Sequence, residues 1–204
     1  MTISGKSETS GGHAGSGFGD SIAFIGDVNG DGFGDVGIAN PKRTGPDVYD
    51  NTGSVYIFGG AADLPREFYE SDLKYKLVKI IGDSAGDRFG TSMAVINDVN
   101  GGGKPDILVG APWATGGGSD TTPVAGKIYL FYTENLLSNP GEDLDTSGAA
   151  KVYTIDTPLG EFSKVLSACA NGTFLAAAPC LSGDSGMAYI YDIDSDDCTE
   201  IGNN

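Results

Sequence analysis

The segment of this sequence with the clearest potential chemistry is the loop from Asp27 to Asp35. It reads Asp-Val-Asn-Gly-Asp-Gly-Phe-Gly-Asp, which places oxygen-bearing side chains at loop positions 1, 3, 5 and 9 and glycine at position 6. Ca²⁺ takes six or more oxygen ligands at about 2.3–2.6 Å, and a tight loop can bring alternate side chains onto one centre. We therefore expect Asp27, Asn29, Asp31 and Asp35 to bind one Ca²⁺, with the carbonyl oxygen of Phe33 as a further ligand.

The same loop also has an interpretation without a metal, because Asp, Asn and Gly favour tight turns. Three carboxylates within nine residues repel one another when no cation is present, and this repulsion favours the calcium interpretation. Position 12 of the loop is Ile38 instead of a bidentate glutamate, so the loop is not a helix-flanked calcium loop.

A second loop with a related pattern runs from Asp98 to Asp106. Gly102 stands at position 5 in place of an acidic residue, and Lys104 adds a positive charge. One ligand and one negative charge are therefore missing. We expect Asp98, Asn100 and Asp106 either to bind Ca²⁺ weakly or to form an empty turn. The third such loop, Ala-Asn-Gly-Thr, has no carboxylate and is not expected to bind a cation.

Both acidic loops lie inside a longer internal repeat. Segments 17–41 and 88–112 correspond at an offset of 71 residues, and an eroded third copy spans residues 161–179. Each copy is followed by a glycine and an aromatic-rich run, which begins at residue 53, 126 or 186. The short runs rich in Val, Ile, Tyr and Phe between Gly, Asn, Asp and Pro predict strands. Repeated four-stranded units are typical of the blades of a β-propeller.

These motifs also resemble a known family. The order Phe-Gly, Asp-Val-Asn-Gly-Asp-Gly, Gly-Ala-Pro and Gly-x-Val-Tyr-x-Phe is similar to the FG-GAP repeat of integrin α-subunits and related extracellular proteins. The resemblance covers residues 17–192 and is specific in the first two units. It implies an all-β fold of three four-stranded antiparallel blades, open or completed by neighbouring molecules, at an extracellular or cell-surface location. It also implies that Asp35 closes the calcium loop between two strands.

The repeat predicts how the chain is divided. We expect an N-terminal strand with a Gly/Ser-rich tether at residues 1–17, blade 1 at 18–83, blade 2 at 84–156, and blade 3 with a polar tail at 157–204. The last blade has no evident outer strand. The tethered N-terminal strand is expected to add to a sheet edge, on the last blade or on another subunit.

Three blades are too few for a closed propeller, which typically has 4 to 8. Open blades leave apolar faces and sheet edges exposed, and such edges invite pairing. The chain is therefore expected to belong to a longer propeller or to assemble into a homo-oligomer or filament, by strand exchange or by stacking.

Composition excludes several classes of function. The chain has 28 acidic and 12 basic residues, a net charge of −16, so nucleic acids and anionic membranes are poor partners. No apolar stretch approaches the ~20 residues needed to cross a bilayer, and the first residues do not resemble a signal peptide.

Further residues are candidates for modification or contact. Cys169 and Cys180 flank a predicted hairpin and are either bridged by a disulfide or free, while Cys198 is left over. Asn171 begins an Asn-Gly-Thr sequon at a predicted turn, and is a glycosylation candidate if the protein is secreted. Trp113 either faces a partner or packs in a blade core, and its size favours the core.

Nothing in the sequence favours catalysis. Gly183-Asp-Ser-Gly186 resembles the segment around a serine-protease nucleophile, but the only histidine, His13, lies in a Gly/Ser stretch. We favour a calcium-stabilised extracellular structural or adhesion module, whose partners are itself, other extracellular proteins or glycans. One alternative is a carbohydrate-binding propeller, although Trp113 has no aromatic counterpart at Lys42 or Cys180. A third is an accessory domain of an enzyme.

Overall fold

The computed structural model describes residues 2–4, 17–42, 50–65, 67–69, 74–114, 126–138, 140–155, 161–169, 171–179, 186–195 and 198–201. Within these ranges the chain is almost entirely β-structure, with one four-residue α-helix, α1 (Thr133–Leu136), and a short 3₁₀ turn at Thr146–Gly148. No helix in the described part of the chain is long and apolar enough to cross a membrane. The predicted all-β class is confirmed.

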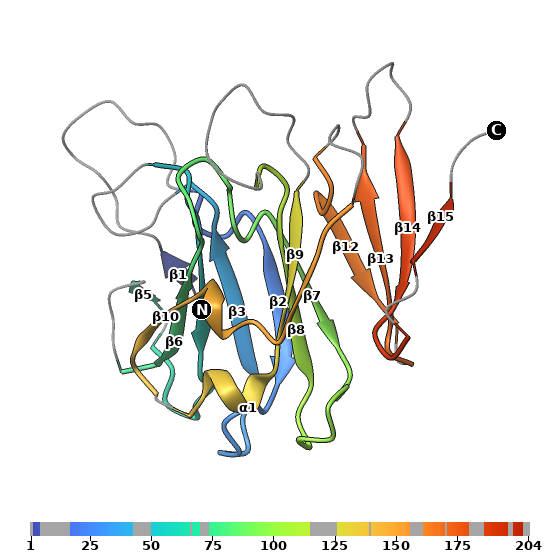
Figure 1. Ribbon diagram of the computed structural model, residues 1–204. Helices are drawn as coiled ribbons and strands as arrows, with labels where there is room; N and C mark the ends of the chain where they lie inside the picture. Colours follow the sequence, from blue (N-terminus) through green and yellow to red (C-terminus); the bar gives the residue numbers. More distant parts are fainter. Residues whose placement is uncertain are drawn as a thin grey trace.

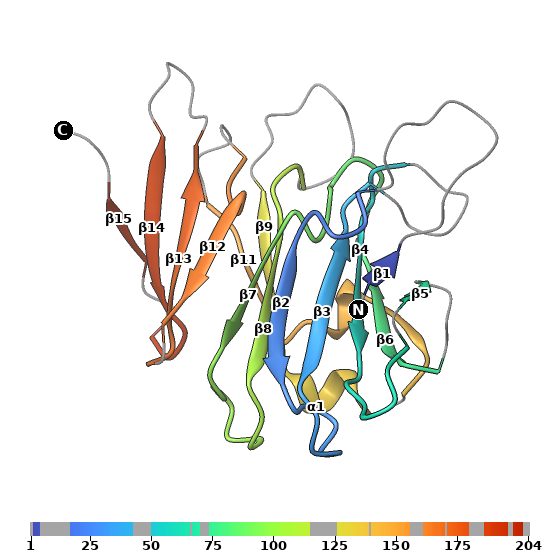
Figure 2. The same ribbon diagram turned by 180° about the vertical axis from the view of Figure 1, so that it is seen from behind.

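Three sheets stand side by side, each built on four antiparallel strands, and we call them blades 1, 2 and 3 in chain order (Figures 1 and 2). Blade 1 contains β2 (Ile22–Gly26), β3 (Asp35–Asn40), β4 (Ser54–Phe58) and β6 (Lys76–Ile81). Blade 2 contains β7 (Ser92–Ile96), β8 (Asp106–Ala111), β9 (Lys127–Phe131) and β11 (Lys151–Tyr153). Blade 3 contains β12 (Val165–Ala168), β13 (Thr173–Ala178), β14 (Met187–Asp192) and β15 (Cys198–Ile201). The described sheets do not close into a ring.

Strand β15 corrects the expectation that blade 3 has no outer strand of its own. It pairs antiparallel with β14, in a register from Ala188↔Ile201 to Tyr191↔Cys198. The carboxylate of Asp192 accepts hydrogen bonds from the backbone N–H groups of residues 194 and 195, which stabilises the turn after β14. A strand at the edge of a sheet can be polar because it is exposed to solvent. The polar sequence of β15 therefore did not predict a strand.

The N-terminal strand also pairs differently from the expectation. β1 (Thr2–Ser4) pairs in parallel with β5 (Glu67–Tyr69), and the two form a small separate sheet. β5 lies in the connection between β4 and β6, so β1 pairs with the segment that links two strands of blade 1 and not with the last blade. The pairing satisfies backbone donors and acceptors of a segment that otherwise has a free edge.

A crossover connection joins blades 1 and 2. After β9 the chain forms α1 and then β10 (Asp143–Asp145), which pairs in parallel with β6 and becomes a fifth strand of blade 1. The carboxylate of Asp143 lies 2.8 Å from Lys76 Nζ and 3.8 Å from Lys79 Nζ. The chain then returns to blade 2 as β11. Part of the range predicted for blade 2 therefore completes the sheet of blade 1.

The blades pack face to face through two apolar cores. The first core lies between blades 1 and 2 and includes Ile25, Val55, Ile57, Ile107 and Phe131. The second lies between blades 2 and 3 and includes Ile96, Leu108, Leu130, Phe174 and Tyr191.

Each contact between blades is closed by the phenylalanine near the start of a repeat copy, Phe89 or Phe162. The ring of Phe89 packs edge to face on Tyr129 and Phe131, and Phe162 packs in the same way on Tyr189. The backbone of Phe89 lies against Gly53 of the preceding blade, where N–H of Phe89 donates to the carbonyl of Thr52 at 2.9 Å.

The face of blade 1 that is turned away from blade 2 is partly exposed. A small cluster, Ile38, Tyr56, Phe58 and Tyr75, is buried there. Beside it on β2, Ile22 is 62% exposed and Phe24 is 84% exposed. The strand register places Ile22 beside Ile38 and Phe24 beside Val36.

Candidate cation loops

The two acidic loops lie at the same end of the molecule. The loop between β2 and β3 and the loop between β7 and β8 project beyond their sheets near α1 (Figure 1). Each is the connection between the first two strands of a blade. The repeat therefore carries the two loops to equivalent places in neighbouring blades.

In the first loop, carboxylates and an amide organise the turn. Asp27 accepts hydrogen bonds from N–H of Gly30, Asp31 and Gly32 at 2.7–3.0 Å. Asn29 Oδ1 accepts from N–H of Asp31 at 2.9 Å, and its Nδ2 donates to Asp31 Oδ2 at 2.9 Å. These bonds hold the side chains of positions 1, 3 and 5 close to the loop backbone, where most of their surface is exposed.

Asp35 is the buried anchor of the first loop, since only 1% of its surface is exposed. Its Oδ2 accepts from N–H of Val28 at 2.9 Å and from N–H of Asn29 at 3.3 Å. Its Oδ1 accepts from N–H of Gly60 at 2.7 Å. Asp35 therefore links the loop to the end of β4, the strand that pairs with β3.

Backbone N–H groups lie close to the carboxylates of the first loop. The repulsion expected among Asp27, Asp31 and Asp35 is offset by N–H groups, so the loop does not need a cation to keep these carboxylates near one another. No group of three His, Cys, Asp or Glu side chains converges as a metal-holding cluster in the part of the chain that the structure describes.

The donor chemistry of the loop nevertheless fits a hard cation. A carboxylate has about four lone-pair sites, and Asp27 and Asp35 use three each for N–H groups, while Asp31 uses two. Free lone pairs therefore remain on all three carboxylates. Oxygen ligands from carboxylate and amide groups suit Ca²⁺ or Mg²⁺ and not the softer metals.

The second loop repeats the backbone bonds to the first aspartate of the loop and part of those to the last. Asp98 accepts from N–H of Gly101, Gly102 and Gly103 at 2.7–2.9 Å. Asp106, with 0% of its surface exposed, accepts from N–H of Val99 at 3.0 Å and from N–H of Thr133 at 3.1 Å.

The pKa values of the two aspartates at the ends of this loop shift in opposite directions. The N–H groups of Gly103, Gly101 and Gly102 lower the pKa of Asp98 against a smaller effect of burial. Burial raises the pKa of Asp106, the N–H groups of Val99 and Thr133 oppose the increase, and the carboxylates of Glu134 and Asp98 add smaller contributions to it.

The loop of blade 3 behaves as a plain turn over its described residues. Asn171 is exposed, and its Oδ1 accepts a hydrogen bond from Thr173 Oγ1 at 2.5 Å. Cys169 is an exposed free thiol, whereas Cys180 lies outside the described residues. The Cys169–Cys180 disulfide and glycosylation of Asn171 stay predictions.

The expectation that Trp113 packs in a blade core is wrong. Its side chain is 38% exposed, and the Arg88 guanidinium lies 4.6 Å from the centre of the ring. Trp113 follows the end of β8, where a cation–π contact with Arg88 takes the place of core packing. His13 and residues 183–185, which were discounted as catalytic, lie outside the described residues.

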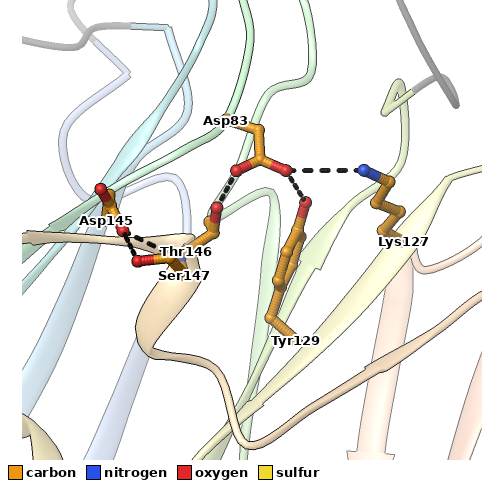
Figure 3. A network of polar contacts seen from close by, with 6 residues as sticks. All are labelled: Asp83, Lys127, Tyr129, Asp145, Thr146 and Ser147. Atoms are coloured by element: carbon orange, nitrogen blue, oxygen red, sulfur yellow. Dashed lines mark hydrogen bonds and ion pairs between the residues drawn. The ribbon is translucent and has the colours of Figure 1, made fainter.

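Sequence reasoning missed a polar network that joins blades 1 and 2 (Figure 3). Asp83, just after β6, accepts a hydrogen bond from Tyr129 OH at 3.0 Å and another from Thr146 Oγ1. Lys127 Nζ lies 3.5 Å from the same carboxylate. Burial, with the nearby Asp83 carboxylate, raises the pKa of Tyr129, so the phenol stays a donor. In the sequence, the only signal for this network was the aspartate that follows the strand-forming run of β6.

Comparisons with known proteins agree with the motifs. The FG-GAP repeat family matches residues 89–131. Integrin alpha-PS5 of Drosophila melanogaster is 32% identical over 119 residues, which cover 58% of this chain and 10% of that protein. Integrin alpha pat-2 of Caenorhabditis briggsae is 35% identical over 127 residues, 61% of this chain and 10% of that protein. Phosphatidylinositol-glycan-specific phospholipase D of Bos taurus is 35% identical over 108 residues, 52% and 12% respectively. The chain thus spans about a tenth of the length of these relatives.

Proposed function

We propose that this chain, which belongs to the FG-GAP repeat family of integrin α-like proteins, is an extracellular structural or adhesion module stabilised by Ca²⁺. The observation that carries the proposal is the repeated acidic loop, in which a buried aspartate links the loop to a neighbouring strand. We retain the blade boundaries 18–83, 84–156 and 157–204 as part of this proposal.

In the first loop, Asp27, Asn29, Asp31, Asp35 and the carbonyl of Phe33 would hold the cation. A bound Ca²⁺ supplies positive charge and fixed coordination, which lowers the repulsion among the three carboxylates. Because Asp35 also accepts from N–H of Gly60, order in the loop would extend to the end of β4. The proposed gain is stability of the blade, with no catalytic step.

The partners proposed for the module are other extracellular proteins or glycans, or further copies of the same chain. Integrin α relatives support an adhesion role, and the exposed Ile22 and Phe24 on blade 1 support contact with another folded surface.

Thermal unfolding in Ca²⁺ and in chelator tests the metal part of the proposal. Ligand that binds only the folded state adds about 2.7 kcal/mol at ~100-fold excess over its Kd. We expect Asp31→Ala to lose the part of the calcium-dependent increase in Tm that belongs to the first loop. Glu142→Ala, which removes an exposed carboxylate outside both loops, is the matched control and should keep the whole increase. Equal melting of the parent protein with and without Ca²⁺ would contradict the proposal.

A second candidate is an accessory domain of an enzyme, which the similarity to phosphatidylinositol-glycan-specific phospholipase D favours. In that case the chain would bind and position a catalytic domain and have no activity alone. Specific, saturable binding to a separately expressed phospholipase catalytic domain would support this role. Binding to an integrin-type ligand without such an interaction would support the adhesion role.

A further inference from the structure

A carboxylate from another element occupies the place of the side chain that the second loop lacks. A Cβ atom added to Gly102 would lie 2.4 Å from Glu134 Oε1 and 2.6 Å from its Cδ. Glu134 belongs to α1, more than thirty residues further along the chain. The Glu134 carboxyl group therefore stands where an acidic side chain at loop position 5 would begin.

Comparison of the two blades shows an exchange of positions. The first loop has Asp31 at position 5, and its anchor Asp35 accepts from N–H of Gly60. The second loop has Gly102 at position 5, and the corresponding donor to Asp106 is N–H of Thr133.

The residue after each donor completes the exchange. Ala61 follows Gly60 in blade 1, whereas Glu134 follows Thr133 in blade 2. The pair Asp31 and Ala61 in blade 1 thus becomes Gly102 and Glu134 in blade 2. The number of carboxylates around each loop stays at three.

Glu134 is directed into the loop and is incompletely satisfied. Its Oε1 accepts a hydrogen bond from Asn100 Nδ2, a side chain at loop position 3. Its Oε2 is buried and has no hydrogen-bond partner. An unpaired buried carboxylate oxygen costs free energy. The Asp106 carboxylate is close enough to interact electrostatically with Glu134, which adds to that cost. A cation beside these oxygens would offset both effects.

We propose that Glu134 replaces the missing loop carboxylate, so that Asp98, Asn100, Asp106 and Glu134 form a Ca²⁺ site shared between the second loop and α1. This inference rests on the proposed calcium role of the repeat. From the sequence we expected weak Ca²⁺ binding at Asp98, Asn100 and Asp106. With Glu134 as an added ligand, we expect an affinity comparable to that of the first loop. Because the described side chains do not yet surround one point, binding would draw Glu134 and the loop together.

The site would act on the crossover connection as well as on the loop. α1 begins the segment that leads to β10, which is a strand of blade 1. A cation held by Glu134 would therefore fix the start of the segment that joins the two blades.

Calorimetric titration with Ca²⁺ tests the inference with four proteins. The parent should bind two ions, and Glu134→Gln should weaken one site at least 10-fold. Asp31→Ala should remove the other site and leave the shared one. Glu142→Gln is the matched control, because it changes an exposed glutamate between α1 and β10, and it should bind as the parent does.

An exchange variant separates a ligand role from a structural one. Gly102→Asp alone should not strengthen the site, because its Cβ would displace the Glu134 carboxylate. Gly102→Asp combined with Glu134→Ala reproduces the arrangement of blade 1 and should restore two ions. In chelator, Glu134→Gln should melt at the same temperature as the parent or higher, because it removes an unpaired negative charge.

The outcomes distinguish this inference from the proposed function. If Asp31→Ala loses one ion and Glu134→Gln binds as the parent does, the shared site is wrong and the calcium role of the first loop stands. If the parent binds no Ca²⁺, both are wrong. A Glu134→Gln protein that loses stability equally with and without Ca²⁺ would show a purely structural role and overturn the inference.

Discussion

Gly53 and Gly126 hold equivalent positions at the two contacts between blades. Both have positive φ, +91° and +78°, and a Cβ at either would lie within 2.2 Å of a carbonyl oxygen, that of Phe89 or Phe162. Glycine is needed at these positions for two independent reasons, the backbone conformation and the close approach of the next blade. The glycine that precedes the aromatic strand in blades 1 and 2 is thus explained by packing between blades.

Replacement of Gly53 by alanine tests this explanation. We expect Gly53→Ala to lower the free energy of unfolding by more than ~2 kcal/mol, because strain at positive φ and a backbone clash add together. Gly86→Ala is the control, since Gly86 has φ +94° but no atom within 4 Å of its added Cβ. It should cost only the conformational part, about 1–2 kcal/mol. If urea unfolding shows the same loss of unfolding free energy for both variants, the close approach of Gly53 to Phe89 does not affect stability.

The residue scale also shows how far sequence patterns reach. The acidic loops were predicted from the spacing of Asp and Asn, because such spacing is local and repeats at a constant offset. Glu134 could not be predicted, since its relation to Gly102 depends on the packing of α1 against a loop from another part of the blade. Trp113 was placed wrongly because its size favours burial, whereas its position after β8 leaves it beside Arg88 at the surface.

At the scale of elements, β10 is the least predictable strand of the fold. It has three residues, Asp-Leu-Asp, with no run of branched or aromatic side chains. Its place is determined by tertiary contacts, chiefly parallel pairing with β6 and the contact of Asp143 with two lysines. β15 is similar, because its polar residues are placed by pairing with β14. The eleven other blade strands are richer in apolar side chains and were more readily predicted.

The lysines at the β10 contact provide a test of this element. The side chains of Lys76 and Lys79 are only 9% and 8% exposed, and Asp143 contacts both. Asp143→Ala removes this partner from both ammonium groups, and we expect a loss of about 1–3 kcal/mol in unfolding free energy. Glu142→Ala, one residue away and exposed, should change stability by less than ~0.5 kcal/mol. A neutral Asp143→Ala would mean that backbone pairing alone holds β10.

At the scale of the whole molecule, the open face of blade 1 is explained by the repeat. Ile22 and Phe24 correspond to Met93 and Val95 of blade 2, which pack in or against the core between blades 1 and 2. The same face is thus covered in blade 2 and largely uncovered at β2 in blade 1. The three sheets that the structure describes follow from the repeat, but the partner of this face cannot be predicted from the chain's own sequence.

Self-association through this face can be measured directly. If copies of the chain contact one another there, Phe24→Asp should lower the sedimentation coefficient at high protein concentration to that of a monomer. Val152→Asp is the control, because Val152 is exposed on β11 of blade 2. A parent protein that sediments as a monomer at all concentrations would contradict assembly through blade 1.

The crossover strand β10 has a consequence for the order of events during synthesis. Blade 1 contains residues 22–81 and also residues 143–145, so its sheet lacks a strand until the third strand of blade 2 has been made. At about 5–20 residues per second, a ribosome needs several seconds to cover that interval. A nascent chain that ends at residue 131 would expose the β6 edge and the two lysines beside it. The blades therefore mature together, and proteolysis of nascent chains should show protection of blade 1 only after residue 145 has emerged.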